Sequence, residues 1–181
     1  MVSSPPSRST SLVDDLVRSP THTSTVSRVA LAIRIDDPHS PDVERLIETH
    51  LAFARGQTPL CHVFALAADA LVGDDVELYS CRDDGLLLGI GALRSLGDGH
   101  FEVKSMHTAL DARGRGIGKL LLQHLIATAR RRGAKRVSLE TGTSAGFAPA
   151  RALYEGAGFE ECAPFADYPY SDDNVCMTMF L

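Results

Sequence analysis

Residues 113–118, Arg113-Gly114-Arg115-Gly116-Ile117-Gly118, separate an apolar stretch with strand-like alternation from a longer stretch with helical periodicity. The three glycines lack the Cβ atoms that would keep an anion away from the backbone. The helix that follows contributes free backbone N–H groups and the positive end of its dipole, a combination that binds phosphate groups. Arg113, Arg115 and Lys119 add positive charges at the same place. This loop therefore predicts a binding site for a diphosphate.

Two other classes of phosphate-binding loop fit this stretch less well. A Walker A loop requires GxxxxGK(S/T), whereas here Leu120 follows Lys119 and Arg113 occupies the first glycine position. A dinucleotide-binding loop has GxGxxG directly after a strand and an acidic residue about 20 residues later. The spacing here is GxGxG, and residues 109–113 separate it from the strand, although Glu140 lies at a suitable distance. A dinucleotide-binding oxidoreductase therefore stays open as an alternative.

The residues before the loop predict strands and two helices. Ser40 as N-cap and Pro41 at the first helical position start a helix that is expected to run to about Arg55. Residues 64–71 predict a second, shorter helix. Alternating apolar residues between turn signals predict strands at 29–35, 76–82, 86–93 and 101–108. The second and third of these strands should pair as a hairpin.

The residues after the loop predict alternating strands and helices. Leu121 and Leu125 lie on the apolar face of a helix expected at 117–132, and Gly133 is a natural stop. Further elements are expected as a strand at 136–140, a helix at 149–155, and short strands at 159–162 and 175–180. An initial meander followed by a βαβα order predicts an α/β fold, in which helices flank a central mixed sheet.

Two motifs give the chain a resemblance to the GNAT superfamily of N-acetyltransferases. Residues 113–118 match the family motif (R/Q)-x-x-G-x-(G/A) at every defined position, and residues 150–159, ARALYEGAGF, match A-x-x-LYE-x-x-GF. The stretches 138–142 and 164–168 also resemble a subgroup of small bacterial members whose substrates are not known. The resemblance covers residues 29–181 in the order of elements. It implies the acyl-CoA N-acyltransferase fold of that superfamily.

The resemblance implies acetyl-CoA as co-substrate and no metal. The strand at 104–108 would run beside the pantetheine arm, with backbone groups of Met106 and Thr108 bonded to its amides, and backbone N–H groups of residues 113–119 would hold the pyrophosphate. His107 lies on the same strand but faces away from Met106, which favours packing or exposure as its ordinary role. The cofactor-binding residues expected on this basis are Met106, His107, Thr108, Arg113, Gly114, Arg115, Gly116, Ile117, Gly118 and Lys119.

The resemblance also implies two catalytic residues. Tyr154 of the second motif would lie beside the CoA sulfur and return a proton to the leaving thiolate. Glu102 stands eleven residues before Arg113, where histone-acetylating members of the superfamily carry their general base. Glu140, at the end of the neighbouring strand, is the rival base. The chain departs from the family at Phe147, because many members have there an Asn that contacts the cofactor.

The expected reaction is transfer of an acetyl group to a primary amine of a small molecule or peptide, by direct attack in a ternary complex. A non-catalytic acyl-CoA-binding module on the same fold is a further alternative. Nothing in the sequence names the acceptor. An acidic and aromatic stretch could form a lip for a cationic amine, although an exposed loop explains it equally well; it contains Asp167, Tyr168, Tyr170, Asp172 and Asp173.

The composition predicts one globular domain at residues 29–181, preceded by a flexible leader at 1–28 that is rich in Ser, Thr and Pro. A net charge of −5 disfavours nucleic acid as a partner, and the cations at 130–132 lie at a helix end that favours them anyway. No apolar run reaches the ~20 residues that cross a bilayer, and no stretch resembles a signal peptide. The four widely spaced cysteines predict reduced thiols in a cytoplasmic protein. A homodimer stays open.

Overall fold

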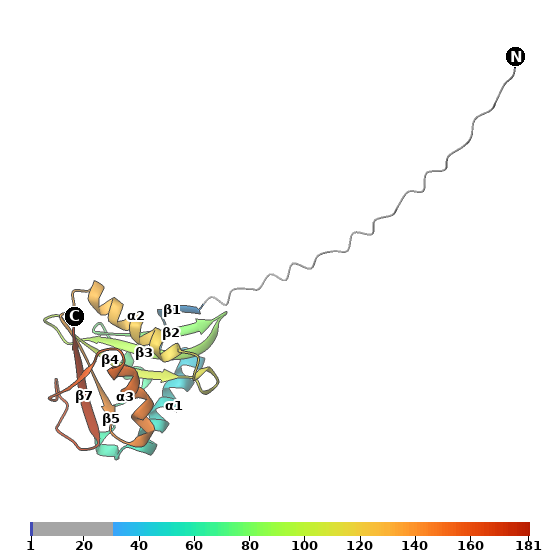
Figure 1. Ribbon diagram of the computed structural model, residues 1–181. Coiled ribbons are helices and arrows are strands. Elements are labelled where there is room, and N and C mark those ends of the chain that lie inside the picture. Colours follow the sequence, from blue (N-terminus) through green and yellow to red (C-terminus); the bar gives the residue numbers. More distant parts are fainter. Residues whose placement is uncertain (2–30) are drawn as a thin grey trace.

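One mixed sheet organises the residues that the computed structural model describes, which are Met1 and 31–181. Within this part of the chain, seven strands follow the order β1-β2-β3-β4-β5-β7-β6 (Figure 1). β4 and β5 are parallel, and the other neighbours are antiparallel. The strands are β1 (Leu31–Ile35), β2 (Val76–Asp83), β3 (Leu86–Ser95), β4 (His100–Thr108), β5 (Arg136–Gly142), β6 (Glu160–Cys162) and β7 (Asn174–Phe180). Apart from Met1, the predicted leader lies outside the described residues.

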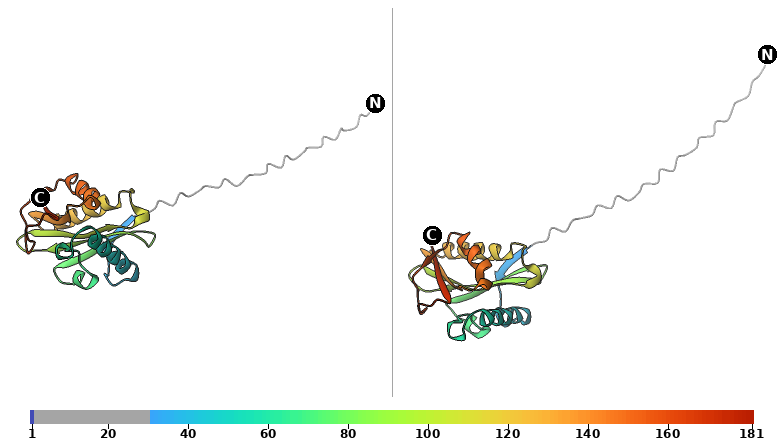
Figure 2. Two further views of the ribbon diagram at one scale, coloured as in Figure 1. Left: turned by 90° about the horizontal axis from the view of Figure 1, so that it is seen from below. Right: turned by 60° about the horizontal axis from the view of Figure 1, so that its bottom comes forward.

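Three α-helices in the described residues cover the two faces of this sheet. α1 (Pro41–Gln57) lies on one face, and α2 (Ile117–Arg131) and α3 (Ala148–Glu155) lie on the other (Figure 2). α1 begins with proline at the predicted position, since the fixed φ of proline suits the first helical residue. α2 stops just before Gly133, whose φ of 79° is left-handed. Among the helices described, none has the length and apolar content required to cross a membrane.

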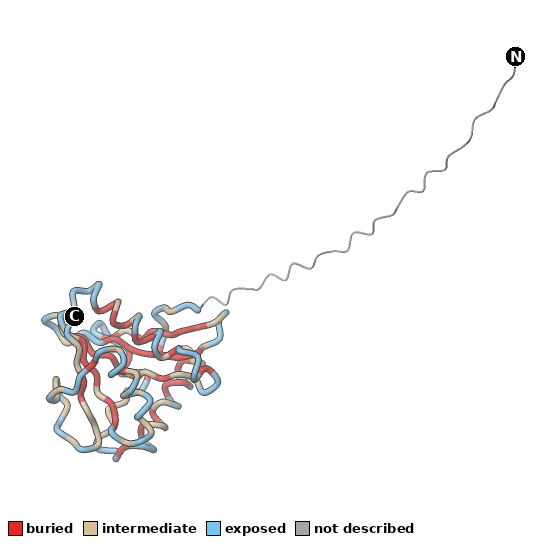
Figure 3. The backbone as a smooth tube through the Cα atoms, viewed as in Figure 1, coloured by how far each residue is buried: buried red, intermediate tan, exposed pale blue. Residues whose placement is uncertain are grey.

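Apolar clusters on both faces attach the helices to the sheet. On one face, Leu125 of α2 packs in the same cluster as Val103 of β4 and Leu139 of β5. On the other face, Ile47 of α1 packs in a cluster with Ile90 of β3. Figure 3 shows that the buried residues concentrate in the central strands and on the inner sides of the helices. Because apolar packing covers both faces of the central strands, their positions are well determined.

β4 and β5 separate part-way along their length. Their parallel pairing spans only His100–Val103 of β4 and Arg136–Leu139 of β5. Beyond it, the register between β3 and β4 shifts between Ile90 and Ala92, so that β4 contains one extra residue. Ser105 lies in this bulge with a φ of 51°. Because a bulge bends its strand, the C-terminal end of β4 leaves β5, and a gap opens between them.

The helix predicted at residues 64–71 is wrong. The structure has short 3-10 turns at Leu60–His62 and Ala68–Leu71, with irregular chain between them. The apolar residues of this stretch divide between two surfaces, because Leu71 packs beneath α1 whereas Phe64 lines a cavity. One helix of eight residues could not serve both surfaces, and so short a helix has little stability of its own.

The other predicted elements are confirmed, with shifts of one or two residues at most of their ends, and the strand predicted at 29–35 is confirmed from residue 31 on, where the described residues begin. The strands at 76–82 and 86–93 pair as the expected hairpin, and the strand at 136–140 continues to Gly142. The α/β fold with a mixed sheet is also confirmed. All four cysteines fall within the described residues and are free thiols.

Candidate active site

A cleft of about 490 Å³ occupies the gap between β4 and β5. Its walls come from residues 104–108 of β4, residues 140–142 of β5, the glycine loop and one side of α3. On the α1 side it is lined by aromatic residues, among them Phe53 and Phe64. Because α1 and α2 lie on opposite faces of the sheet, the cleft passes through the gap from one face to the other.

The glycine loop lies at the α2 side of this cleft. Gly114 and Gly116 have φ values of 73° and 80°, in the left-handed region that residues with a Cβ seldom adopt. A Cβ at either position would meet no atom within 4 Å, so the space beside this backbone is open. Gly116 is the N-cap of α2, whose first N–H groups have no acceptor within the helix. The loop thus forms an open cradle of N–H groups that fits a diphosphate.

Known proteins share this architecture. The model of the family described as Acetyltransferase (GNAT) family matches residues 43–159. The chain belongs to this family. It is 41% identical over 146 residues to YsnE, an uncharacterized N-acetyltransferase of Bacillus subtilis, across 81% of this chain and 97% of that protein. It is also 41% identical over 136 residues to YedL, an uncharacterized N-acetyltransferase of Escherichia coli, across 75% of this chain and 86% of that protein.

A solved GNAT structure shows the same fold. The GNAT family acetyltransferase from Elizabethkingia anophelis, solved with acetyl-CoA bound, has a TM-score of 0.61 and 20% identity, and the match covers 83% of this chain and 98% of that chain. The family match and the named relatives make the protein an acetyl-CoA-dependent acyltransferase, as the two sequence motifs predict.

The GNAT cleft brings together most of the residues that were expected to bind acetyl-CoA. Arg115 is the exception, because its Nη2 lies 3.7 Å from Oδ2 of Asp83 and its side chain does not line the cleft. The side chain of Ile117 is buried in the core, so only its backbone is available to a ligand. The nine that line the cleft are Met106, His107, Thr108, Arg113, Gly114, Gly116, Ile117, Gly118 and Lys119. Their contacts with acetyl-CoA stay a prediction.

His107 shows how the α1 side of the cleft is built. Its ring centroid lies 5.3 Å from that of His50 and 6.2 Å from that of Phe53. Burial, helped by the charge of Arg113, lowers the pKa of His107 to about 4. Burial and the neighbouring His107 likewise lower the pKa of His50 to about 4. Both rings are therefore uncharged at neutral pH and form part of an apolar wall.

Glu102, the first candidate for the general base, is enclosed beside the cleft and does not line it. Its side chain is 2% exposed. Its Oε1 accepts hydrogen bonds from Nζ of Lys104 at 2.8 Å and from the hydroxyl of Tyr168 at 2.5 Å. Lys104 also donates to the hydroxyl of Tyr168. The carboxylate of Glu102 is thus held in a closed cluster of three polar side chains.

Glu140, the rival base, lines the cleft directly. It is the first residue of β5 beyond the segment paired with β4, which ends at Leu139. Burial raises the pKa of Glu140 to about 7; the charge of Lys104 opposes this rise, and the charge of Glu102 adds to it. A carboxylate with such a pKa is partly ionised at neutral pH, which suits a group that accepts a proton during a reaction.

Tyr154 of α3 belongs to the core and to the cleft at once. It is 6% exposed and packs in the same apolar cluster as Leu125, yet it also lines the cavity. Burial, together with the charge of Glu140, raises the pKa of Tyr154, so its hydroxyl keeps its proton at neutral pH. Phe147, where many GNAT members have Asn, lines the same cavity and packs edge-on against Phe53 at 5.1 Å between centroids.

The expected acidic lip is divided in the structure. Asp167 and Asp172 are exposed and do not line the cleft. Asp173 instead lies 2.7 Å from Nδ1 of His62, and His62 lines the cleft. Tyr168 also lines it, next to the Glu102 cluster. Tyr170 is exposed and does not line the cleft either. Of the five expected residues, only Tyr168 lines the cleft, and Asp173 contacts it through His62.

Sequence interpretation missed the roles of Lys104 and His62 in this region. A signal existed for Lys104, because strand alternation places it on the same face as Glu102, two residues away. His62 and Asp173 are 111 residues apart in the chain, so no local pattern could join them.

Proposed function

We propose that this acetyltransferase transfers the acetyl group of acetyl-CoA to a primary amine of a small molecule or peptide, by direct attack within a ternary complex. The observation that carries the proposal is the cleft, which connects the glycine loop with Glu140, Tyr154 and an aromatic wall through the gap in the sheet. Acetyl-CoA would enter beside the loop, and the amine would enter from the α1 side.

The groups that would hold acetyl-CoA are backbone groups with free hydrogen-bonding capacity. Acetyl-CoA supplies the acetyl group as a thioester. The open space beside Gly114 and Gly116 fits its pyrophosphate. Beyond Val103, β4 has β3 on one side and no partner strand on the other. Backbone groups of Met106 and Thr108 on that free side would pair with the pantetheine amides.

We assign the general base to Glu140 in preference to Glu102. An amine must be neutral to attack a carbonyl carbon, so the ammonium form has to lose a proton, and a carboxylate can accept it. Glu140 borders the cleft, and its pKa of about 7 allows it to take up this proton. The C–N bond then forms as the C–S bond breaks, and the nitrogen gives up its second proton, which replaces the proton that the leaving thiolate takes up. Glu102 would act indirectly, because its charge and its ion pair with Lys104 influence the pKa of Glu140.

Tyr154 is proposed to supply the proton that the CoA thiolate takes up as it leaves. Its hydroxyl is protonated at neutral pH, since burial raises its pKa. Tyr154→Phe removes only this hydroxyl and keeps the ring in the core. We expect kcat to fall by roughly 10²-fold, with nearly unchanged affinity for acetyl-CoA. Wild-type kcat in this variant would contradict the role.

A turnover screen tests the proposed reaction. The enzyme and acetyl-CoA are incubated with polyamines, amino acids, aminoglycosides and peptides with free N-termini, and acetylated products are detected by mass spectrometry. We expect at least one amine to be acetylated, with release of CoA that depends on that amine. Binding of acetyl-CoA without acetylation of any of these amines would contradict the proposed acceptor class.

A further inference from the structure

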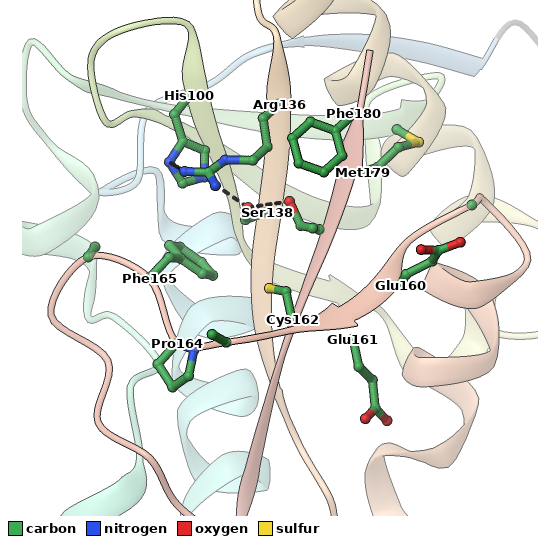
Figure 4. A pocket seen from close by; sticks show the side chains of 14 residues that line it. His100, Arg136, Ser138, Glu160, Glu161, Cys162, Pro164, Phe165, Met179 and Phe180 are labelled. Carbon is green, nitrogen blue, oxygen red and sulfur yellow. Dashed lines mark hydrogen bonds between the residues drawn. The ribbon is translucent and has the colours of Figure 1, made fainter.

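A second groove, of about 770 Å³, lies at the end of the sheet where β5, β6 and β7 meet (Figure 4). None of its lining residues lines the acetyl-CoA cleft. Side chains from one face of three neighbouring strands form its floor: His100 of β4, Arg136 and Ser138 of β5, and Thr178 of β7. The segment after β6, with Phe165, faces this floor.

A directional chain of hydrogen bonds holds Arg136 in place on the floor. Its Nη2 lies 2.8 Å from Nδ1 of His100, and because a guanidinium can only donate, Nδ1 accepts. Neutral His100 then carries its proton on Nε2 and donates to Oγ of Ser138 at 2.8 Å. Ser138 donates to Oγ1 of Thr178 at 2.8 Å, and Thr178 donates to the carbonyl of Val137 at 3.3 Å. Burial and the charge of Arg136 lower the pKa of His100, which keeps the ring neutral.

Most hydrogen-bond donors of the Arg136 guanidinium have no acceptor among the described residues. A guanidinium carries five N–H groups, and the side chain of Arg136 makes a hydrogen bond only to His100 within the part of the chain that the structure describes. By contrast, Arg82, Arg94 and Arg132 each contact a carboxylate. A guanidinium that is held in place with open donors matches the planar geometry of a carboxylate.

Apolar side chains stand beside these donors. The ring of Phe165 lies 5.4 Å from that of His100, and Phe180, which pairs with Arg136 across the sheet, is 75% exposed. Pro164, Cys162 and Met179 also line the groove, and Figure 4 shows Phe180 next to the Arg136 side chain. The groove can therefore cover the body of a molecule as well as its charged end.

The charge of the groove limits the ligand further. Glu160 and Glu161 also line it, and their negative charges disfavour a phosphate dianion relative to a singly charged group. We propose that this groove binds an organic monocarboxylate with a flat apolar body, the carboxylate on Arg136 and the body against Phe165 and Phe180. The site is separate from the acetyl-CoA cleft and does not depend on the acetyl-transfer mechanism.

Calorimetric titration of the full chain with benzoate tests this proposal. Phenyl phosphate and benzyl alcohol serve as comparison ligands, because they keep the ring and change the charged group. We expect benzoate to bind more tightly than either, with and without saturating CoA. Arg136→Met should weaken benzoate binding at least about tenfold, since it removes charge-assisted hydrogen bonds. Arg130→Met, which removes an exposed arginine at the end of α2, should leave it unchanged.

Several outcomes would overturn the proposal: no saturable benzoate binding, equal affinity in Arg136→Met, displacement of benzoate by CoA, or tighter binding of phenyl phosphate. Circular dichroism shows whether Arg136→Met is folded. If Arg136→Met is not folded, Arg136→Lys takes its place as the test, because it keeps the positive charge but lacks the planar guanidinium that can form two parallel hydrogen bonds to a carboxylate. This variant should also bind benzoate more weakly than the wild type, and unchanged affinity would contradict the site.

Discussion

Gly116 has a left-handed backbone conformation and lies at the expected binding site of the acetyl-CoA pyrophosphate. Gly116→Val places a branched side chain in the open space of the cradle and should weaken acetyl-CoA binding at least about tenfold, because a pyrophosphate could no longer reach the backbone. Calorimetry measures this affinity. Gly85→Val is the matched control, since Gly85 has a φ of 87° and also has open space beside it, in the β2–β3 turn. Both variants should lose about 1–2 kcal/mol of stability. Equal affinities would show that the loop does not hold the cofactor.

At this scale, the sequence predicts local features better than distant ones. The glycine loop can be predicted from the sequence because its glycines, its cations and its helix are adjacent in the chain. The choice between Glu102 and Glu140 cannot be predicted in this way, because it depends on where β4 and β5 separate. Similarly, the contact between Glu102 and Tyr168 joins residues 66 positions apart, and no sequence pattern near either residue predicts it.

At the scale of elements, Arg82 joins β2 to the start of α1. Its guanidinium donates to Asp36 at 2.9 Å, to Asp42 at 2.6 Å and to the carbonyl of Gly85 at 2.9 Å, and Arg82 is buried. Arg82→Met leaves the enclosed carboxylate of Asp36 without its cation and should lower the free energy of unfolding by about 3 kcal/mol. Urea unfolding measures the loss.

Arg94→Met is the control for this prediction. Arg94 pairs with Asp75 at 2.8 Å, but both side chains are about half exposed. Removing such a pair should cost less than about 1 kcal/mol. Equal losses in the two variants would mean that burial does not distinguish these ion pairs.

The elements themselves were largely predictable from periodicity and turn signals, because each packs one apolar face on the sheet. The stretch at 64–71 fails for a related reason. Its apolar residues are helix-like in spacing, but Phe64 serves the cleft and Leu71 serves the core. When the apolar residues of one stretch pack on two different surfaces, a single helical period does not describe their arrangement.

At the scale of the whole molecule, the cleft crosses the sheet between β1–β4 and β5–β7, so a bound cofactor would contact both parts. A ligand that binds only the native state stabilises it by about 2.7 kcal/mol at 100 times its Kd. For a chain of this size, the melting temperature should rise by roughly 5–10 °C with acetyl-CoA. Differential scanning fluorimetry checks this. NADH should give no comparable rise, and a protein that acetyl-CoA does not stabilise would show that the cleft does not hold this cofactor.

The pH dependence of kcat/KM, measured with the best acceptor from the turnover screen, tests whether Glu140 is the general base. If Glu140 is the base, it must be ionised to work, so the wild-type rate should rise with pH through about 7, the pKa that burial gives it. Glu140→Gln should lose this rise and lower kcat/KM by roughly 10²-fold. Glu102→Gln should keep the rise but move it to lower pH, because it removes a neighbouring negative charge. A Glu140→Gln enzyme with the wild-type profile, beside a Glu102→Gln enzyme without it, would show that Glu102 and not Glu140 is the base.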